Sequence, residues 1–284
     1  MTTSISPPVE PGDAFLRNCT ALSVSGEGAR VFLQGQCSQD VLSIDSHEAR
    51  WSLLLEPDGK LGALVRIVCL GDDDFVVLAD PARIDEVFAR LSRFKLRVRA
   101  VIETVRVKIA ISRNATSPAG GIPLPSFSTE LVETLSEEVT SAASPEDHVD
   151  SAFEEFLNAD LAIQDRDARA GMNPFELGSA VIEQAVSFTK GCYTGQELVA
   201  RIDARGSSAP FRLVGAVVSG AGTFAADEPV MVAGEHVGSV LRGGTRGDHF
   251  EGIVRLARKV ECPVDGIAGT ADVFLRELGE QRPI

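Results

Sequence analysis

The residues best suited to chemistry lie in one octapeptide, residues 190–197, which reads Lys-Gly-Cys-Tyr-Thr-Gly-Gln-Glu. Its two glycines, Gly191 and Gly195, predict a turn or a close approach of two backbone segments. A thiol in such a polar turn is accessible, and the neighbouring Lys190 would favour the thiolate form of Cys192. The alternative is that Cys192 is a small buried hydrophobic residue, as free cysteines often are.

The rest of the chain offers no second set of reactive residues. The five cysteines are widely spaced and include no C-x-x-C pair, so neither a metal site nor a disulfide framework is expected. The four histidines are scattered, and no nucleotide-binding or hydrolase motif is present. This cysteine usage predicts a reducing, cytoplasmic compartment.

Charge and hydropathy restrict the partners. The net charge is −14, which repels nucleic acid and anionic membranes in general. One basic group runs from Arg90 to Arg99, but it is also typical of a solvated helix end that leads into a strand. No apolar run approaches the roughly 20 residues that span a bilayer, and residues 1–13 lack the features of a signal peptide. We therefore expect no direct nucleic-acid binding and no membrane association.

The elements that must position the octapeptide begin with strands. A short strand is expected at Leu22 and Val24, and a hairpin joins residues 51–55 to 61–70 through a Pro-Asp-Gly-Lys turn. Another strand is expected at 74–79. Asp80 and Pro81 then predict a helix start, followed by one apolar helical face: Ile84, Val87, Phe88 and Leu91.

The second half alternates loops, a helix and short strands. A half-buried strand is expected at 105–111, loops at 112–128 and 136–150, and a second helix from Phe153 through Leu161 toward Arg169. Beyond Gly206 short strands separated by glycine turns predict a β-sandwich or barrel. We therefore place a domain boundary near residue 208, which divides the chain into residues 1–208, an α+β region, and residues 209–284.

Several segments together resemble one family. The octapeptide is similar to the K-G-C-Y-x-G-Q-E signature of the YgfZ branch of the folate-binding, aminomethyltransferase-like superfamily. Residues 32–36 (F-L-Q-G-Q) with Asp40-Val41, the L-x-P-x-G-K turn at 55–60, and Arg201 with Arg205-Gly206 also resemble this branch. The order and spacing agree over nearly the whole chain.

The resemblance implies a fold, a cofactor and a role. It implies two intertwined α+β folate-binding subdomains, a small C-terminal β-barrel, and tetrahydrofolate or a derivative as cofactor. It also implies support of iron–sulfur cluster assembly or repair in client enzymes, including tRNA-modifying ones, in a way that depends on Cys192. Folate contacts are expected from six residues: Lys190, Tyr193, Gln196, Glu197, Arg201 and Arg166.

One departure concerns the folate site. The superfamily often carries an arginine four residues before the glycine of an R-x-x-A-G segment, and here Asp167 occupies that place before Gly171. Arg166 and Arg169 flank it, but one residue is about 100° of rotation on a helix, so neither inherits the role automatically.

Two alternatives to the cluster-maintenance role remain. One is a folate-dependent one-carbon enzyme, either an aminomethyltransferase or a demethylase. The other is a binding module without cofactor chemistry, which the missing arginine motivates.

Overall fold

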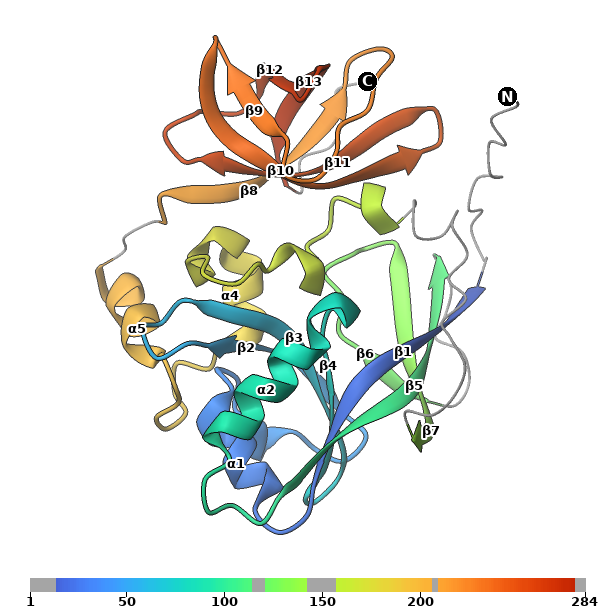
Figure 1. Ribbon diagram of the computed structural model, residues 1–284, viewed down its shortest axis with the longest axis vertical. Helices are drawn as coiled ribbons and strands as arrows, with labels where there is room; N and C mark the ends of the chain where they lie inside the picture. Colours follow the sequence, from blue (N-terminus) through green and yellow to red (C-terminus); the bar gives the residue numbers. More distant parts are fainter. Residues whose placement is uncertain (1–13, 114–120, 142–156, 206–208, 279–284) are drawn as a thin grey trace.

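The computed structural model describes residues 14–113, 121–141, 157–205 and 209–278. These residues form an α+β body of mixed strands and helices, surmounted by a closed β-barrel (Figure 1). The expected α+β fold with a C-terminal barrel is confirmed. The boundary expected near residue 208 lies outside the described residues, and the first barrel strand begins at Phe211.

The body is built on one antiparallel sheet of seven strands in the order β2-β3-β4-β1-β5-β7-β6. Its strands are β1 (Ala14–Ser25), β2 (Ala49–Leu55), β3 (Leu61–Gly71), β4 (Asp74–Leu78), β5 (Val101–Arg113), β6 (Ile122–Leu124) and β7 (Leu131–Ser141). Its helices and helical turns are α1 (Ala29–Gln36), η1 (Val41–Ser43), η2 (Pro81–Arg83), α2 (Ile84–Phe94), η3 (Asp165–Asp167), η4 (Pro174–Leu177), α4 (Ser179–Ala185) and α5 (Gln196–Arg205).

Strand β2 shows why the sheet is buried on both faces. Side chains alternate along a strand, so Trp51, Leu53 and Leu55 point to one face and Leu54 to the other. Leu54 packs in a core with residues of α1 and α2, whereas the other three pack in a core with α4 and with barrel residues. Helices thus cover one face of the sheet, and α4 with the barrel covers the other.

The barrel is closed in the order β10-β11-β8-β13-β12-β9 and has its own apolar interior. Its strands are β8 (Phe211–Val218), β9 (Pro229–Val232), β10 (Glu235–Arg246), β11 (His249–Ala257), β12 (Val264–Ala268) and β13 (Ala271–Glu277). Five of these strands were expected from glycine-bounded apolar runs, and β12 was not. Closure leaves no unpaired strand edge.

Three expectations on the body are wrong. Residues 122–124 form a strand within the expected loop at 112–128, and residues 136–141 belong to β7 rather than to a loop. The second helix does not continue toward Arg169: among the described residues it covers only 157–159 and is followed by irregular chain and the turn η3. Its expected start at Phe153 and Phe156 lies outside the described residues.

The predicted start of α2 is close to the observed one. Asp80 accepts a hydrogen bond from the Ala82 N–H at 3.1 Å, but the first turn is the 3-10 turn η2, and α2 begins at Ile84. The basic residues that follow form no single patch. Arg90 is buried, and Arg93 and Arg99 form ion pairs with glutamates. None of the described helices has the length and apolarity that crossing a membrane requires.

Candidate functional site

The octapeptide meets two of the other motif segments in space, although they are far apart in sequence. The Thr194 N–H donates to the Gly35 carbonyl at 3.0 Å, which joins the octapeptide to α1. Gly195 lies against the β2–β3 turn, with φ of +81°. Three of the motifs that carried the family resemblance are thus one packing unit.

Two glycines make this contact possible. A Cβ at Gly195 would lie 2.4 Å from the Glu56 carbonyl oxygen, and a Cβ at Gly59 would lie 2.2 Å from the Leu198 Cβ. Both positions also have positive φ, a conformation that side chains disfavour. Glycine is therefore required here for close backbone approach.

Lys190 anchors the octapeptide to the end of α1. Its Nζ donates to the carbonyl oxygens of Gln34 and Cys37, each at 2.6 Å, and of Gln39 at 2.9 Å. An ammonium has three N–H donors, so these bonds leave none for the thiolate of Cys192. Burial lowers the pKa of Lys190, while the helix C-terminus is a favourable place for its charge.

Cys192 is exposed, so the alternative of a buried thiol is excluded by this structure. The neighbouring Tyr193 is half-buried, and burial raises the pKa of its phenol to about 12. Lys190 Nζ lies 5.1 Å from the centre of the Tyr193 ring. The thiol is therefore presented to solvent by a loop that is held firmly on both sides.

The remaining predicted residues of this segment lie on α5. The Gln196 side chain accepts a hydrogen bond from the Tyr193 N–H at 3.2 Å, which fastens the start of the helix. Glu197 and Arg201 are exposed and lie four residues apart on one helical face. The structure thus brings five of the predicted residues together: Lys190, Cys192, Tyr193, Gln196 and Glu197, with Arg201 one turn further on.

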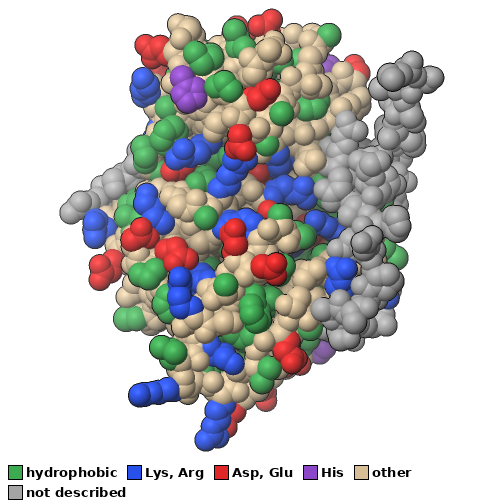
Figure 2. Space-filling model, in the orientation of Figure 1, with side chains coloured by type: hydrophobic (Ala, Val, Ile, Leu, Met, Phe, Trp, Pro, Cys, Tyr) green, Lys and Arg blue, Asp and Glu red, His purple; other side chains and the backbone are tan. Residues whose placement is uncertain are grey.

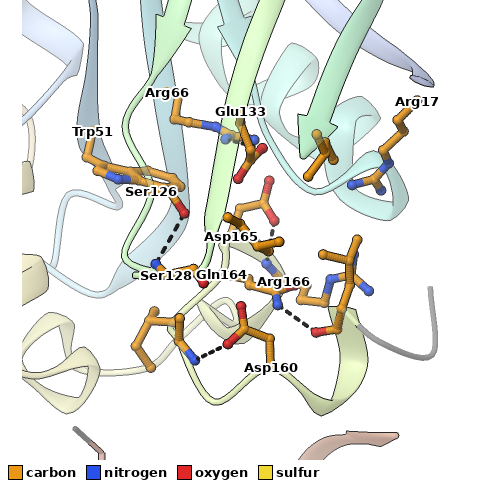
Figure 3. A pocket seen from close by; sticks show the side chains of 15 residues that line it. Arg17, Trp51, Arg66, Ser126, Ser128, Glu133, Asp160, Gln164, Asp165 and Arg166 are labelled. Carbon is orange, nitrogen blue, oxygen red and sulfur yellow. Dashed lines mark hydrogen bonds and ion pairs between the residues drawn. The ribbon is translucent and has the colours of Figure 1, made fainter. Parts of the chain in front are cut away.

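A second cluster lies elsewhere, around a cavity between the sheet and residues 157–166 (Figure 3). The cavity volume is about 30 Å³, room for about two water molecules. Trp51, Arg66 and Asp160 line it, and their exposed fractions are only 4%, 6% and 7%. Arg166, a predicted site residue, also lines it and donates to Asn158 Oδ1 at 2.9 Å.

Three residues that line this cavity each carry a buried polar atom with no hydrogen-bond partner among the described residues: Trp51 Nε1, Arg66 Nε and Asp160 Oδ2. Buried polar atoms are nearly always paired, and leaving one unpaired costs roughly 1–3 kcal/mol. Two donors and one acceptor on residues that line one cavity are therefore consistent with a binding site for a polar ligand or ordered water.

The buried charges around the cavity are paired with opposite charges. Arg66 donates to Glu133 at 2.7 Å, and its guanidinium lies 5.0 Å from the centre of the Trp51 ring. Burial opposes the charge of Arg66, but Glu133 and Asp165 outweigh it and raise its pKa. Burial also raises the pKa of Asp160, against the bonds from Ala162 and Ser128 and the charges of Arg242 and Arg246.

The cavity adjoins a groove of about 1470 Å³ that is lined by residues of both the body and the barrel. Five residues line both spaces: Ser126, Ser128, Asp160, Ala162 and Ile163. Figure 2 shows Lys and Arg side chains interspersed with acidic ones in the band between the barrel and the body. Phe188 lines the groove, but Cys192, four residues later, is not among the residues that line the cavity or the groove.

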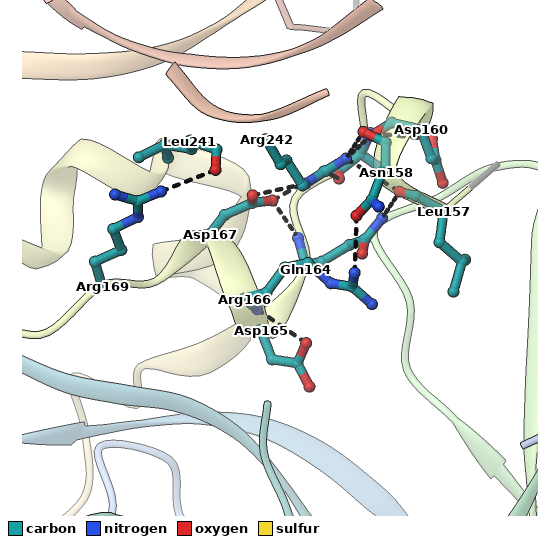
Figure 4. A network of polar contacts seen from close by, with 11 residues as sticks. Leu157, Asn158, Asp160, Gln164, Asp165, Arg166, Asp167, Arg169, Leu241 and Arg242 are labelled. Carbon is teal, nitrogen blue, oxygen red and sulfur yellow. Dashed lines mark hydrogen bonds and ion pairs between the residues drawn. The ribbon is translucent and has the colours of Figure 1, made fainter. Parts of the chain in front are cut away.

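Asp167, which stands where the family often has an arginine, makes a different set of contacts. Asp167 is fully buried and accepts from Arg242 of the barrel at 2.7 and 3.0 Å (Figure 4). Arg169 turns to the barrel as well, where it pairs with Asp227 and donates to the Leu241 carbonyl at 2.8 Å. Of the two flanking arginines, Arg166 is the one at the cavity.

Sequence reasoning missed Trp51, Arg66 and Asp160. One signal was available, because Arg66 interrupts the otherwise apolar strand β3 and a charge in such a place needs a reason. Among the described residues no group of three or more His, Cys, Asp and Glu side chains could hold a metal ion.

The fold places the chain among known proteins. No protein-family model matches it. The structure is similar to glycine cleavage system aminomethyltransferase T from Bartonella henselae, with a TM-score of 0.72, 14% identity, and coverage of 94% of this chain and 86% of that one. The class is therefore the aminomethyltransferase-like fold.

Sequence relatives define the branch. An uncharacterized protein of Haemophilus influenzae is 30% identical over 208 residues, which cover 66% of this chain and 67% of that protein. The tRNA-modifying protein YgfZ of Vibrio vulnificus is 26% identical over 230 residues (72% and 70%), and that of Serratia proteamaculans is 28% identical over 224 residues (68% and 67%). Within the aminomethyltransferase-like class, the chain belongs to the YgfZ-type family.

Proposed function

We propose that this protein binds a reduced folate in the cavity and its adjoining groove, and that it supports iron–sulfur cluster assembly or repair in client enzymes through the thiol of Cys192. The observation that carries the first part is the set of three unpartnered polar atoms at Trp51, Arg66 and Asp160. The proposal that the clients include tRNA-modifying enzymes draws on relatives that are named as tRNA-modifying proteins.

The chemistry of a pterin fits these atoms. Its pyrimidinone edge presents N–H donors beside a carbonyl oxygen, so a carboxylate can accept from the former and two N–H groups can donate to the latter. Asp160 supplies the carboxylate, and Trp51 and Arg66 supply the donors. Because the cavity alone has room for about two waters, the ring would lie toward the groove and direct its polar edge inward.

The groove can take the rest of such a ligand. Arginines of the barrel line it, among them Arg212, Arg258 and Arg276, together with glutamates such as Glu277, to which Arg212 donates at 2.6 Å. The carboxylates of a glutamate tail would compete with these glutamates for the guanidinium groups. A volume of about 1470 Å³ exceeds the roughly 300–1000 Å³ of typical small-molecule sites.

The position of Cys192 supports a macromolecular client for the thiol. The thiol is exposed on a firmly held loop and is not part of the cavity or groove lining. A surface thiol can be reached by another protein, whereas a cofactor in the cavity would have to leave it to meet the sulfur. We therefore assign ligand binding and thiol chemistry to different surfaces of the molecule.

The test uses Trp51, the single tryptophan, as reporter. Titration with tetrahydrofolate should change its fluorescence, and Asp160→Asn should weaken binding by roughly 10- to 100-fold, the worth of a hydrogen bond to a charged group. Cys192→Ser is the matched control, which should bind folate normally but lower the activity of cluster-dependent enzymes in cells.

Contrary outcomes are equally specific. Undiminished folate affinity in Asp160→Asn would rule out the ligand site, and normal client activity with Cys192→Ser would rule out the thiol. Turnover of tetrahydrofolate with an amine donor would instead identify a folate-dependent one-carbon transferase. No folate binding by the unaltered protein would leave a binding module without the cofactor.

A further inference from the structure

Both irregular walls of the cavity are bonded to one strand of the barrel. The wall formed by residues 157–166 is bonded to Arg242, and Glu130, next to the Ser126–Ser128 wall, is bonded to Arg246. Arg242 and Arg246 both belong to β10. The barrel therefore contributes to a cavity that it does not itself line.

Arg242 shapes its wall through backbone atoms (Figure 4). Its Nη1 donates to the carbonyls of Leu157 at 3.1 Å, Asn158 at 2.7 Å and Asp160 at 2.6 Å, and its Nη2 donates to that of Ala162 at 2.8 Å. Together with the two bonds to Asp167, these contacts employ all five N–H donors of the guanidinium.

These bonds also explain why the helix ends at residue 159. In a continuing α-helix the carbonyls of residues 157–162 would accept from amides four positions further on. Here four of them point at one guanidinium instead. The conformation that places Asp160 at the cavity thus depends on the planar fork of Arg242.

The same strand sets the electrostatic surroundings of Asp160. Asp160 Oδ1 accepts from the Ala162 N–H at 3.1 Å, while Oδ2 is the unpartnered atom at the cavity. Positive charge comes from β10 through Arg242 and Arg246. Further charged groups that line the cavity come from the sheet and from residues 165–166: Arg17, Arg66, Glu133, Asp165 and Arg166.

We propose that Arg242 and Arg246 are positioning residues for the ligand of this cavity: Arg242 fixes the backbone that carries Asp160, and Arg246 braces the opposite wall and supplies positive charge. This inference rests on the proposed folate function. It makes the barrel part of the binding site, so ligand affinity should depend on how the barrel packs against the body.

The experiment compares Arg246→Gln, Arg246→Lys and Arg242→Lys in the full chain, with Lys259→Gln as control. Lys259 is an exposed barrel residue paired with Glu235, so its change removes the same charge away from the cavity. Tetrahydrofolate affinity is measured by Trp51 fluorescence from pH 4 to pH 8, beside the melting temperature of each unliganded variant.

Arg246→Gln should move the pH below which binding is lost upward, so affinity should fall most at the acidic end of the range, about tenfold there, and little at pH 8. The sign follows because the ionised carboxylate accepts from the ligand, and removal of a nearby cation favours its protonation. Arg246→Lys should restore the pH profile. Arg242→Lys keeps the charge but loses the fork, so affinity should fall with the pH midpoint unchanged.

A readout without folate separates this inference from the proposed function. Arg242→Lys should increase quenching of Trp51 by acrylamide, because the cavity wall is no longer held in place. Wild-type affinity, pH profile and quenching in both Arg246→Gln and Arg242→Lys would overturn the inference. If the unaltered protein does not bind tetrahydrofolate but quenching still rises in Arg242→Lys, the brace stands and the folate function fails.

Discussion

Replacement of Gly195 by alanine tests whether the octapeptide is held by backbone packing. Its φ of +81° costs a residue with a side chain roughly 1–2 kcal/mol. The added Cβ would also lie 2.4 Å from the Glu56 carbonyl oxygen and 2.7 Å from the Leu55 Cβ. Overpacking of this kind costs about 1–3 kcal/mol, so the free energy of unfolding should fall by roughly 2–5 kcal/mol.

Urea denaturation followed by Trp51 fluorescence measures this change, since Trp51 lies on the same strand as Leu55. Gly191→Ala is the matched control within the octapeptide. A Cβ at Gly191 meets nothing within 4 Å, so the free energy of unfolding of this variant should change by no more than about 0.5 kcal/mol. Equal stability of Gly195→Ala and Gly191→Ala would refute the reasoning, because only the former has a close contact.

Three further predictions concern the same loop. Tyr193 is the only tyrosine, and its absorbance at 295 nm should show a titration midpoint near pH 12 in the folded protein and near pH 10 in urea. The stability contributed by the neutral, buried phenol is therefore fully present below pH 10 and is lost as the pH rises through 12. A midpoint at pH 10 in the folded protein would contradict this. Thiol labelling at pH 8 should be fastest at exposed Cys192, so Cys192→Ser should remove the fastest phase. Buried Cys37, with its pKa raised by burial to about 11, should stay unreactive, and an unchanged fastest phase in Cys192→Ser would disprove the assignment. Lys190→Met leaves three carbonyls without their donor and should lower the free energy of unfolding by about 1–3 kcal/mol, so an unchanged urea midpoint would show that water replaces the ammonium at no cost.

Local chemistry made much of the fold predictable. The Pro-Asp-Gly-Lys turn defines the β2–β3 hairpin, and glycine-bounded apolar runs define most of the barrel. The prediction of a long second helix was wrong for a non-local reason. Arg242, some 80 residues away, donates hydrogen bonds to the carbonyls that would have accepted from amides within the helix. No pattern within residues 153–169 contains that information.

The candidate site also has parts that the sequence predicted and parts that it did not. The octapeptide was found because its composition is unusual, and the exposure of Cys192 follows from its polar setting. The task of Lys190 was not predictable, since its partners are backbone carbonyls and carry no residue signature. The cavity is lined by Trp51, Arg66 and Asp160 from three separate segments, and only the folded chain shows that these residues meet.

Strand β2 carries both surfaces of the molecule that the proposed function uses. Trp51 lines the cavity and Leu55 contacts the octapeptide, about 13 Å apart at roughly 3.3 Å per residue, and both point to the same side of the strand. Insertion of a single residue between them would turn one of the two side chains to the opposite side of the sheet. Any variant that shortens or lengthens this five-residue stretch should therefore lose ligand binding or thiol presentation outright.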